Sequence, residues 1–353
     1  MIKSMQKQGG SLRNVVRATR EQRGWSQQEL AQRSGLSRTG ISAIEAGRLI
    51  PSTAAALALA AAFCCRVEDL FVLGVDTSAT WAWSPSSTSG RYLQATIGER
   101  QVMYPMESNP LGCIPHDAIW QNDQFQNHAL TDPAQTCVVA CCDPAVGLLA
   151  SEYTRQTSYR MIVFTRPGLE ALDLLSKGLI HAAGLHFSDS HGADKNKTAA
   201  AGILSQKFKL LKIADWDEGL ALAPGLSTQK IEILLKSKLR WIGREKGSGA
   251  YQMLQDLSGG LICPEHIARD HRGVAQAIRN GFVQAGISLR LPCEEEGVEF
   301  LSLKSKAYEL CTLESTGEDP RILALQKVAQ SLSYRRLLSE LPGYECKSTG
   351  EIR

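Results

Sequence analysis

Apolar residues recur every three or four positions over residues 12–71, and this spacing predicts a bundle of short amphipathic helices. Helices are expected at about 12–23, 27–34, 37–46 and 54–65. The last of these is almost wholly apolar, so it is expected in a core, with an exposed partner interface as the alternative. From about residue 135 the pattern changes, and short apolar runs alternate with helical periods.

Residues that start and stop helices bound the second and third predicted helices. Ser26 offers an N-cap oxygen with Glu29 three positions later, as in a capping box, and Ser37 caps the next helix. Gly35 lies between the two helices and Gly47 ends the second, because glycine adopts the left-handed turn without steric cost. Two helices joined by such a tight turn are typical of a motif that places its second helix in the DNA major groove.

The stretch 11–73 resembles the Cro/repressor-type (XRE) helix-turn-helix domain. The resemblance implies that Ser37 to Ala46 is the recognition helix, and that Arg20 and Glu45 form an ion pair between the first and third helices. The residues that carry the resemblance are Arg20, Gly24, Ser26, Gln27, Glu29, Leu30, Ala31, Gly35, Ser37, Ile41, Ser42, Ile44, Glu45, Gly47, Pro51, Leu70 and Phe71.

The same resemblance implies which side chains contact DNA. Arg38, Thr39 and Ser42 should face base edges, and Gln27 should contact a phosphate. Arg38 alternatively contacts a phosphate or is only solvated. The family often has Asn where this chain has Ala46, and Arg48 is expected to replace that contact. The predicted DNA-binding residues are Gln27, Ser37, Arg38, Thr39, Ser42 and Arg48.

Charge is distributed unevenly along the chain. Residues 1–73 carry ten Lys or Arg and five Asp or Glu, whereas the remainder carries 29 basic and 31 acidic residues. The basic excess therefore coincides with the predicted DNA-binding domain, as phosphate contacts require. A length of 353 residues with 43% hydrophobic residues predicts two or three globular domains.

Residues 1–10 are expected to form a flexible tail, and residues 74–134 a linker and a small β-rich connector. The linker is rich in turn residues, and RYLQATIGERQVMYPM (91–106) has the short alternating segments of a hairpin. Three tryptophans are expected to pack the connector against a neighbour, with stacking on nucleic acid as the alternative. They are Trp81, Trp83 and Trp120.

The alternation of strands and helices after residue 135 predicts parallel sheets with ligands at the carboxyl ends of the strands. A polar loop is expected at 188–198. Strands are predicted at 136–142, 161–164, 179–186, 210–214, 219–223, 239–242, 286–291, 298–303 and 308–313, and helices at 143–153, 167–177, 229–238, 251–257, 272–284 and 320–341.

Residues 135–350 are similar to the periplasmic-binding-protein-like domain that recurs behind helix-turn-helix domains and is related to molybdate- and tungstate-type solute-binding proteins. The segments that carry the resemblance are CDPAVGLLA, GLEALDLLSKGLIHAAGLH, LRWIGREKGSGAYQML, HRGVAQAIRNG and LPGYECKSTGE. The predicted protein is therefore multidomain. An all-α helix-turn-helix domain (11–73) and the connector precede an α/β, two-lobed, periplasmic-binding-protein-like (type II) domain (135–353), whose ligand is expected between the lobes.

Two strand-to-helix corners are candidates for anion binding. In REKGSG (244–249), small residues let backbone N–H groups approach an anion, and Arg244 offers a bidentate fork; a simple turn is the alternative. TRPG (165–168) is a second such corner, and Asp143 is either a third or an N-cap. His186 and His271 either line the cleft or are structural. The predicted ligand-binding residues are Asp143, Thr165, Arg166, Gly168, His186, Arg244, Gly247, Ser248, Gly249 and His271.

Several activities lack a signature in the sequence. No His/Cys spacing matches a zinc site, so no metal site is predicted. No Ser/His/Asp set can be assembled and GSGAYQ lacks a nucleotide-binding fingerprint, so we predict no catalytic residues, no cofactor and no enzymatic activity. The N-terminus has no apolar leader, and the longest apolar run has 12 residues, too few to span a bilayer. The protein is expected to be cytoplasmic, away from membranes, with its ten cysteines as reduced thiols.

The sequence thus predicts a transcriptional regulator that binds operator DNA as a homodimer and responds to a small, anionic effector. Molybdate or tungstate is the leading effector by resemblance, followed by a phosphorylated or pterin-like metabolite. Two alternatives remain: a DNA-binding protein whose large domain only dimerises or recruits a partner, and an enzyme built on the same fold.

Overall fold

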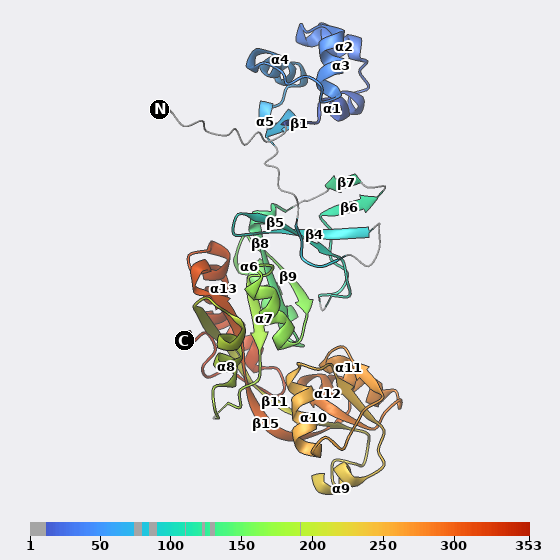
Figure 1. Ribbon diagram of the computed structural model, residues 1–353, viewed down its shortest axis with the longest axis vertical. Helices are drawn as coiled ribbons and strands as arrows, with labels where there is room; N and C mark the ends of the chain where they lie inside the picture. The colour runs from blue at the N-terminus through green and yellow to red at the C-terminus, as the bar shows by residue number, and fades with distance from the viewer. Residues whose placement is uncertain are drawn as a thin grey trace. The chain divides into compact units, whose positions relative to one another are not determined.

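A computed structural model of the chain describes its helices and strands (Figure 1). The chain divides into two compact units, Met1–Ser78 and Ala79–Arg353. The predicted tail at 1–10 lies outside the described residues, as do much of the predicted linker and short stretches of the connector. The described residues are 12–73, 80–84, 90–109, 111–121, 124–127, 131–190 and 192–353.

The N-terminal unit is a bundle of short helices closed by a small antiparallel ladder. Strand β1 (Leu12–Asn14) pairs with β2 (Phe71–Leu73), so the first and last described segments of the unit are joined. The sequence prediction of one helix over 12–23 is wrong at its start, because backbone groups of residues 12–14 bond across to residues 71–73. The helices are α1 (Val16–Gln22), α2 (Gln27–Ser34), α3 (Arg38–Glu45), α4 (Thr53–Phe63) and α5 (Val67–Leu70).

The predicted helix caps are confirmed. Ser26 Oγ accepts a hydrogen bond from the N–H of Glu29, and Ser37 Oγ accepts one from Gly40. Gly35 ends α2 with φ of 69°, in the left-handed region. The apolar sides of the helices form one buried cluster, which confirms that α4 is a core helix. Its buried members are Val16, Leu30, Ala31, Ile41, Ile44, Ala56, Leu59, Ala60, Phe63, Leu70 and Phe71.

The predicted ion pair between Arg20 on α1 and Glu45 on α3 is present and almost fully buried. Arg20 Nε lies 2.6 Å from Glu45 Oε1, and Arg20 Nη2 lies 3.1 Å from Glu45 Oε2. Arg20 Nη1 also donates to the carbonyl of Trp25, in the turn before α2. A bidentate pair with an added backbone bond fixes the mutual position of the first three helices.

The predicted β-rich connector is a five-stranded sheet, counted over the described residues, and its predicted hairpin is confirmed by the pairing of β4 with β5. It packs closely on the rest of the second unit: the Trp83 ring meets Phe164 edge-on, and the Tyr104 hydroxyl donates to the carbonyl of Leu179. Its strands are β3 (Thr80–Trp81), β4 (Gly90–Ile97), β5 (Arg100–Pro105), β6 (Ala118–Gln121) and β7 (Gln124–Asn127), in the order β3-β5-β4-β6-β7.

A larger sheet, nine-stranded among the described residues, runs through two lobes. In lobe 1, β8 pairs in parallel with β9 and β10, as predicted, and buried clusters cover both faces. The elements of lobe 1 are β8 (Thr136–Cys141), β9 (Arg160–Thr165), β10 (Ala182–Leu185), α6 (Val146–Gln156), α7 (Gly168–Ser176), α8 (Lys195–Ile203), α13 (Pro320–Gln330) and α14 (Leu332–Ser339), with the 3₁₀ turns Pro133–Gln135 and Glu314–Thr316.

Lobe 2 repeats this plan on a smaller scale. Strand β12 pairs in parallel with β13 and β14, and helices cover both faces. The elements of lobe 2 are β12 (Trp241–Arg244), β13 (His266–Ala268), β14 (Ala285–Leu289), α9 (Ile231–Lys236), α10 (Gly249–Ser258), α11 (His271–Arg279) and α12 (Arg290–Glu296).

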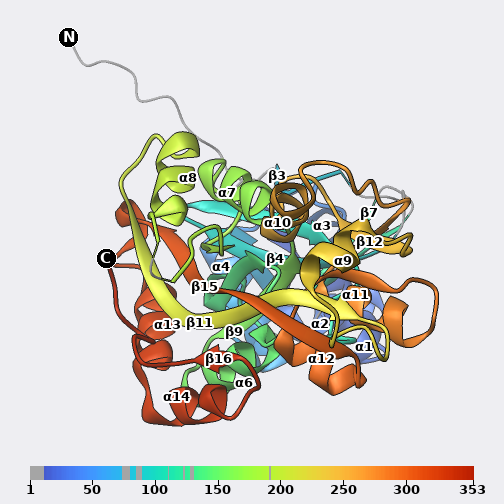
Figure 2. The same cartoon turned by 90° about the horizontal axis from the view of Figure 1, so that it is seen from below.

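Two long antiparallel strands, β11 (Phe208–Leu222) and β15 (Glu299–Leu313), join the lobes (Figure 2). β15 pairs with β10 of lobe 1 through Ala183–Leu185, and β11 pairs with β14 of lobe 2 through Glu218–Leu222. The ladder between them shifts register beside Lys212 and again between Glu218 and Gly219. A short strand, β16 (Tyr344–Glu345), pairs with β11 near the middle of that strand.

Several predicted boundaries are wrong in the second unit. The two strand pairs predicted at 210–223 and 298–313 are single strands, because the polar residues between the apolar runs lie within the β11–β15 ladder. The predicted loop at 188–198 contains the start of α8, capped by Asp194. The predicted helix 320–341 is two helices divided at Ser331, whose backbone is extended. Helix α12 (Arg290–Glu296) is not among the predicted elements.

Loss of Arg20 should destabilise the N-terminal unit. Arg20→Ala leaves the buried Glu45 carboxylate without its guanidinium, so the unit should lose about 3 kcal/mol of stability. Amide hydrogen exchange of α1–α3, measured by mass spectrometry on the full chain, reports this loss. Arg17→Ala is the matched control, because Arg17 forms an ion pair with Glu21 on the surface. Such an exposed pair contributes at most about 1 kcal/mol to stability. Equal exchange in the two variants would contradict the structural role of the buried pair.

Candidate functional site: a DNA-reading helix and an interlobe cluster

Helix α3 presents a polar face opposite its buried one. Ile41 and Ile44 point into the core, whereas Arg38 and Thr39 are exposed and Ser42 is half-buried. The helix therefore offers its first turn and the position one turn later to solvent, which is the geometry that major-groove reading requires.

The other predicted DNA contacts lie at the ends of helices. Ser37 caps α3 and its Oγ lies 3.1 Å from Thr39 Oγ1, so its hydroxyl is already engaged. Arg48 is exposed after the end of α3. Gln27 begins α2, and its amide nitrogen donates to Glu45 Oε2 at 2.9 Å. The Glu45 carboxylate thus holds α1, α2 and α3 together, and Gln27 braces the reading helix.

In the second unit, the ends of several strands converge between the lobes. Cys142 follows β8, Thr165 ends β9 and His186 follows β10, all from lobe 1; Arg244 ends β12 and His271 begins α11, both from lobe 2. The joining strands contribute further buried polar side chains at the same level: Trp216 and Glu218 from β11, and Tyr308 from β15.

Many of these buried polar atoms have no hydrogen-bond partner among the described residues. Buried polar groups in folded proteins are nearly always paired, so a concentration of unpaired ones makes this region a candidate binding site. The unpaired atoms in this region are Asp143 Oδ2, His186 Nε2, Trp216 Nε1, Glu218 Oε1 and Oε2, Arg244 Nη1, His271 Nδ1 and Nε2, and Tyr308 OH.

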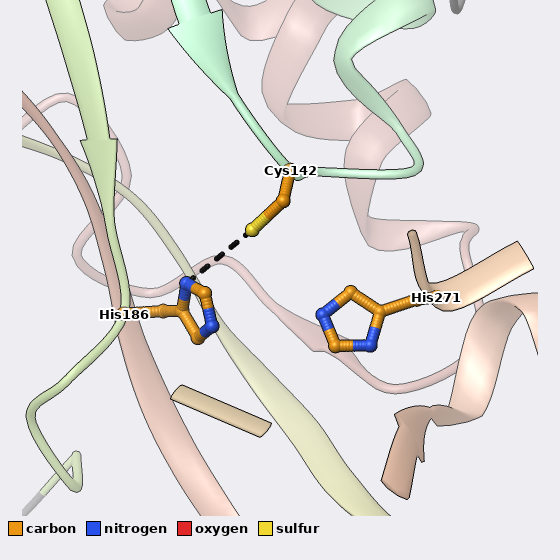
Figure 3. A group of neighbouring side chains, drawn as sticks. All are labelled: Cys142, His186 and His271. Carbon is orange, nitrogen blue, oxygen red and sulfur yellow. Dashed lines mark hydrogen bonds between the residues drawn. The ribbon is translucent and has the colours of Figure 1, made fainter. Parts of the chain in front are cut away.

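Three of the side chains face one another at the centre of this region (Figure 3). Cys142 Sγ lies 3.6 Å from His186 Nδ1, and either atom can be the donor in this contact. The His271 ring faces the same space from lobe 2, with its centroid 6.1 Å from that of His186. One ligand atom from each of the three residues lies within 4.8 Å of the other two. We call this group the Cys-His-His cluster.

The electrostatic surroundings keep these groups neutral. Burial, followed by the nearby Arg244 guanidinium, lowers the pKa of His186 to about 3 and that of His271 well below its usual value. Burial also raises the pKa of the Cys142 thiol. The cluster therefore contains two neutral imidazoles and one protonated thiol at neutral pH.

A cavity of about 380 Å³ opens beside the cluster. Cys142, Asp143 and Thr165 line it from lobe 1, and His271 and Arg272 from lobe 2. Burial raises the pKa of Asp143 to about 6, although hydrogen bonds from the Tyr344 hydroxyl and the Ala145 N–H oppose this change. The cavity is thus large enough for a small molecule and is lined by residues of both lobes.

The two predicted corners both lie where a strand ends and a helix follows, and their arginines are paired with carboxylates. Arg244 already forms a bidentate pair with Glu245, so only its Nη1 remains for a ligand, and the expected bidentate fork is wrong. Arg166 pairs with Glu107 and Glu170 and lies over the Trp83 ring. Its charge is therefore neutralised by these two carboxylates.

The remaining predicted residues have structural tasks that the structure explains. Asp143 does not cap α6 but closes a turn by accepting from Ala145. Ser248 caps α10 through Tyr251. A Cβ on Gly168 would lie 2.7 Å from the Phe187 ring, and one on Gly249 would lie 2.8 Å from His186 Nε2.

Gly249 therefore lets α10 begin directly against a side chain of the other lobe. Gly247 has φ of 91°, a backbone conformation that side chains rarely adopt.

Sequence reasoning missed Cys142, Trp216, Glu218 and Tyr308. Glu218 had one visible signal, a carboxylate directly before the apolar run Gly219–Ala223. Cys142 is predicted only as the last residue of a strand, because His186 and His271 lie 44 and 129 residues further along the chain.

These features define a class of protein: a helix-turn-helix domain on the same chain as a two-lobed domain of the solute-binding type. The sequence model of the PBP superfamily domain matches residues 150–330, and that of the helix-turn-helix domain matches residues 16–70. The chain belongs to the PBP superfamily and carries an XRE-type helix-turn-helix domain at its N-terminus.

Two relatives from Bacillus subtilis (strain 168) each match one part of the chain. The uncharacterized protein YvgK is 28% identical over 194 residues, and the match covers 52% of this chain and 62% of YvgK, less than two thirds of its length. The uncharacterized HTH-type transcriptional regulator YgzD is 37% identical over 62 residues, which cover 18% of this chain and 94% of YgzD.

The chain is also similar to solved structures at low sequence identity. A putative phosphate ABC transporter substrate-binding protein from Clostridium perfringens, with bound phosphate, aligns with a TM-score of 0.47 and 11% identity, covering 60% of this chain and 100% of that one. The tungstate ABC transporter structure from Geobacter sulfurreducens aligns with a TM-score of 0.45 and 12% identity, covering 58% and 98%. Among the described residues of this chain, no helix has the length and apolar character needed to cross a membrane.

Glu218 should make the stability of the second unit depend on pH. Burial raises its pKa from the usual 4.5 to about 7, against the opposing effect of Lys306, Arg244 and Lys304 and with a smaller contribution from Asp189. Between these two values the folded protein retains a proton that the unfolded chain releases, so stability falls as the pH rises through this window.

Glu218→Gln cannot ionise and should lack this fall. Between pH 5 and pH 8 the wild type should lose up to about 3 kcal/mol more stability than the variant, as measured by urea unfolding at each pH. The comparison with the variant is necessary because His186 and His271, with lowered pKa values, change stability in the opposite direction. Parallel pH profiles for the two proteins would contradict the raised pKa.

Proposed function

We propose that the protein is a ligand-responsive transcriptional regulator that binds operator DNA through α3 and a small effector between its two lobes. One observation carries the proposal. Helix α3, with its N-cap and its exposed polar face, is on the same chain as two lobes that enclose many unpaired, buried polar atoms. One helix-turn-helix domain covers a single half-site, so we propose a homodimer that binds a pseudo-palindromic operator in the cytoplasm.

We propose that the effector is a small anion. Arg244 Nη1, Trp216 Nε1 and the Tyr308 hydroxyl are unpaired donors in the interlobe region, and the N-terminus of α10 directs its backbone dipole toward the same region. Molybdate and tungstate are the leading candidates through the sequence resemblance, and a phosphorylated or pterin-like metabolite is the next. Closing of the lobes over the anion would pair groups that otherwise stay unsatisfied, so the effector would favour the closed form.

We propose that the protein is not an enzyme. The contact between Cys142 and His186 has the composition of a nucleophile and its base, but burial raises the pKa of the thiol. A catalytic cysteine needs the opposite, a lowered pKa in an electropositive and accessible place. The third possibility, a large domain that only dimerises, gives no reason for the unpaired polar atoms between the lobes.

The DNA contacts can be separated by two substitutions. Arg38→Ala should reduce operator affinity by about 1–3 kcal/mol and relax sequence preference, whereas Gln27→Ala should weaken binding to operator and unrelated DNA alike. Fluorescence anisotropy with both DNAs at several salt concentrations measures the difference. An equal loss on all sequences for both variants would contradict this division of roles.

The effector is tested by thermal unfolding of the full chain with a panel of oxyanions and small metabolites that includes molybdate, tungstate and phosphate. An effector present at 100 times its dissociation constant should stabilise the binding domain by about 2.7 kcal/mol. The effector should then change operator affinity in the anisotropy assay.

Two arginine variants provide the matched control. Arg244→Met removes the unpaired Nη1 and should abolish the stabilisation, whereas Arg166→Met removes a neutralised guanidinium and should largely retain it. Absence of stabilisation by every member of the panel would contradict an anionic effector and favour a domain that serves only in assembly.

A further inference from the structure

The Cys-His-His cluster has the geometry of a metal site. Two ligands of a tetrahedral ion, bonded through sulfur at about 2.3 Å and through nitrogen at about 2.1 Å, lie about 3.6 Å apart. Cys142 Sγ and His186 Nδ1 lie 3.6 Å apart, and one ligand atom from each of Cys142, His186 and His271 lies within 4.8 Å of the other two. A small inward movement of the His271 ring would complete three ligand bonds.

The residues around the cluster leave these atoms available. His271 is 1% exposed, and neither of its ring nitrogens has a hydrogen-bond partner among the described residues. His181 is also buried, but it differs from His271 because its Nδ1 accepts a hydrogen bond from the backbone N–H of Val138 in β8. His186 directs Nε2 toward Gly249 and Nδ1 toward Cys142. The lone pairs needed by a metal ion therefore face the centre of the cluster.

We propose that Cys142 Sγ, His186 Nδ1 and a ring nitrogen of His271 bind one thiophilic transition-metal ion that links the two lobes. On binding, the S–H bond of Cys142 breaks, an S–metal bond forms and the proton passes to solvent. The imidazoles are already neutral and release no proton. The fourth position of the ion faces the interlobe cavity, where water or an anion can occupy it.

The pairing of Arg244 with Glu245 bears on which ion the cluster prefers. Arg244 and Glu245 form a pair without net charge, and a thiolate with Cu(I) is also neutral. A thiolate with Zn(II) keeps one positive charge beside the Arg244 guanidinium. Burying that charge costs more free energy than burying the neutral Cu(I) thiolate, unless an anion fills the fourth position. Thiolate and imidazole ligands suit both ions, so Cu(I) and Zn(II) share the chemistry and the experiment distinguishes them.

The ion would act on the lobes directly. Cys142 and His186 belong to lobe 1 and His271 to lobe 2, so all three bonds exist only when the lobes are closed. A metal that binds this form alone shifts the population toward it. The regulatory consequence rests on the proposed function, whereas binding of the ion does not.

Metal binding is tested on the reduced, metal-free full chain. Co(II) serves as a spectroscopic substitute for Zn(II), and Cu(I) is titrated against a competing chromogenic chelator under anaerobic conditions. The expected result is one equivalent of ion per chain, with a thiolate-to-Co(II) charge-transfer absorption in the near ultraviolet. Tighter binding of Cu(I) or of Zn(II) in these competitions identifies the ion that the site prefers.

Substitutions locate the ion in the chain. Cys142→Ser and His271→Leu should each weaken binding by at least about 100-fold, while circular dichroism shows that each variant is folded. Cys263→Ser is the matched control, because Cys263 is an exposed thiol of lobe 2 and should leave affinity unchanged. Failure of the wild type to compete with the chelator for either ion, or wild-type affinity in both cluster variants, would overturn the proposal.

The regulatory step has a separate measurement. Operator affinity is compared for the metal-free and metal-loaded chain, and again for Cys142→Ser with the same ion. A change in the wild type that the variant lacks supports regulation through the cluster. If the ion binds at the cluster but operator affinity stays constant, the ion is not the effector. If the chain binds no operator at all, the proposed function fails while the metal titration still decides the site.

Discussion

The pairing of β11 with β15 is the constraint on which the second unit depends. Each strand belongs to both lobes: β15 pairs with β10 in lobe 1, and β11 pairs with β14 in lobe 2. The polar residues at the middle of this ladder must therefore lie between the lobes, whatever covers them. The register shift between Glu218 and Gly219 locally interrupts the ladder at that level and bends the strand there.

This constraint has an energetic consequence. A buried donor or acceptor without a partner costs about 1–3 kcal/mol, and several such groups meet between the lobes. An apolar interface of the same shape would avoid this cost, and the proposed effector would offset it by pairing with these groups. With the proposed effector bound, the closed form would become favourable in proportion to how well the effector pairs with these groups, which is the differential affinity that a ligand-driven switch needs.

The parts of this fold that sequence reasoning found are those specified by local signals. Serine caps and glycine turns located α2 and α3 nearly to the residue, since such signals act within one or two helical turns. The sequence pattern divides β11 and β15 into two strands each, because polar residues inside a strand look the same in sequence as a polar loop. Cys142, His186 and His271 escaped recognition as a group because strand order, not spacing, brings them together.

The two proposed occupants also bear on each other. An anion held near Arg244 and a cation held by the Cys142 thiolate would lie on neighbouring sides of one small space, so each would reduce the electrostatic cost of the other. Linkage makes the effect reciprocal. If the bound ion raises the affinity for the anion by some factor, the bound anion raises the affinity for the ion by the same factor. A buried cluster of neutral ligands beside a paired guanidinium can therefore respond to the joint presence of a metal and an anion more strongly than to either alone, because the closed lobes enclose both charges at once.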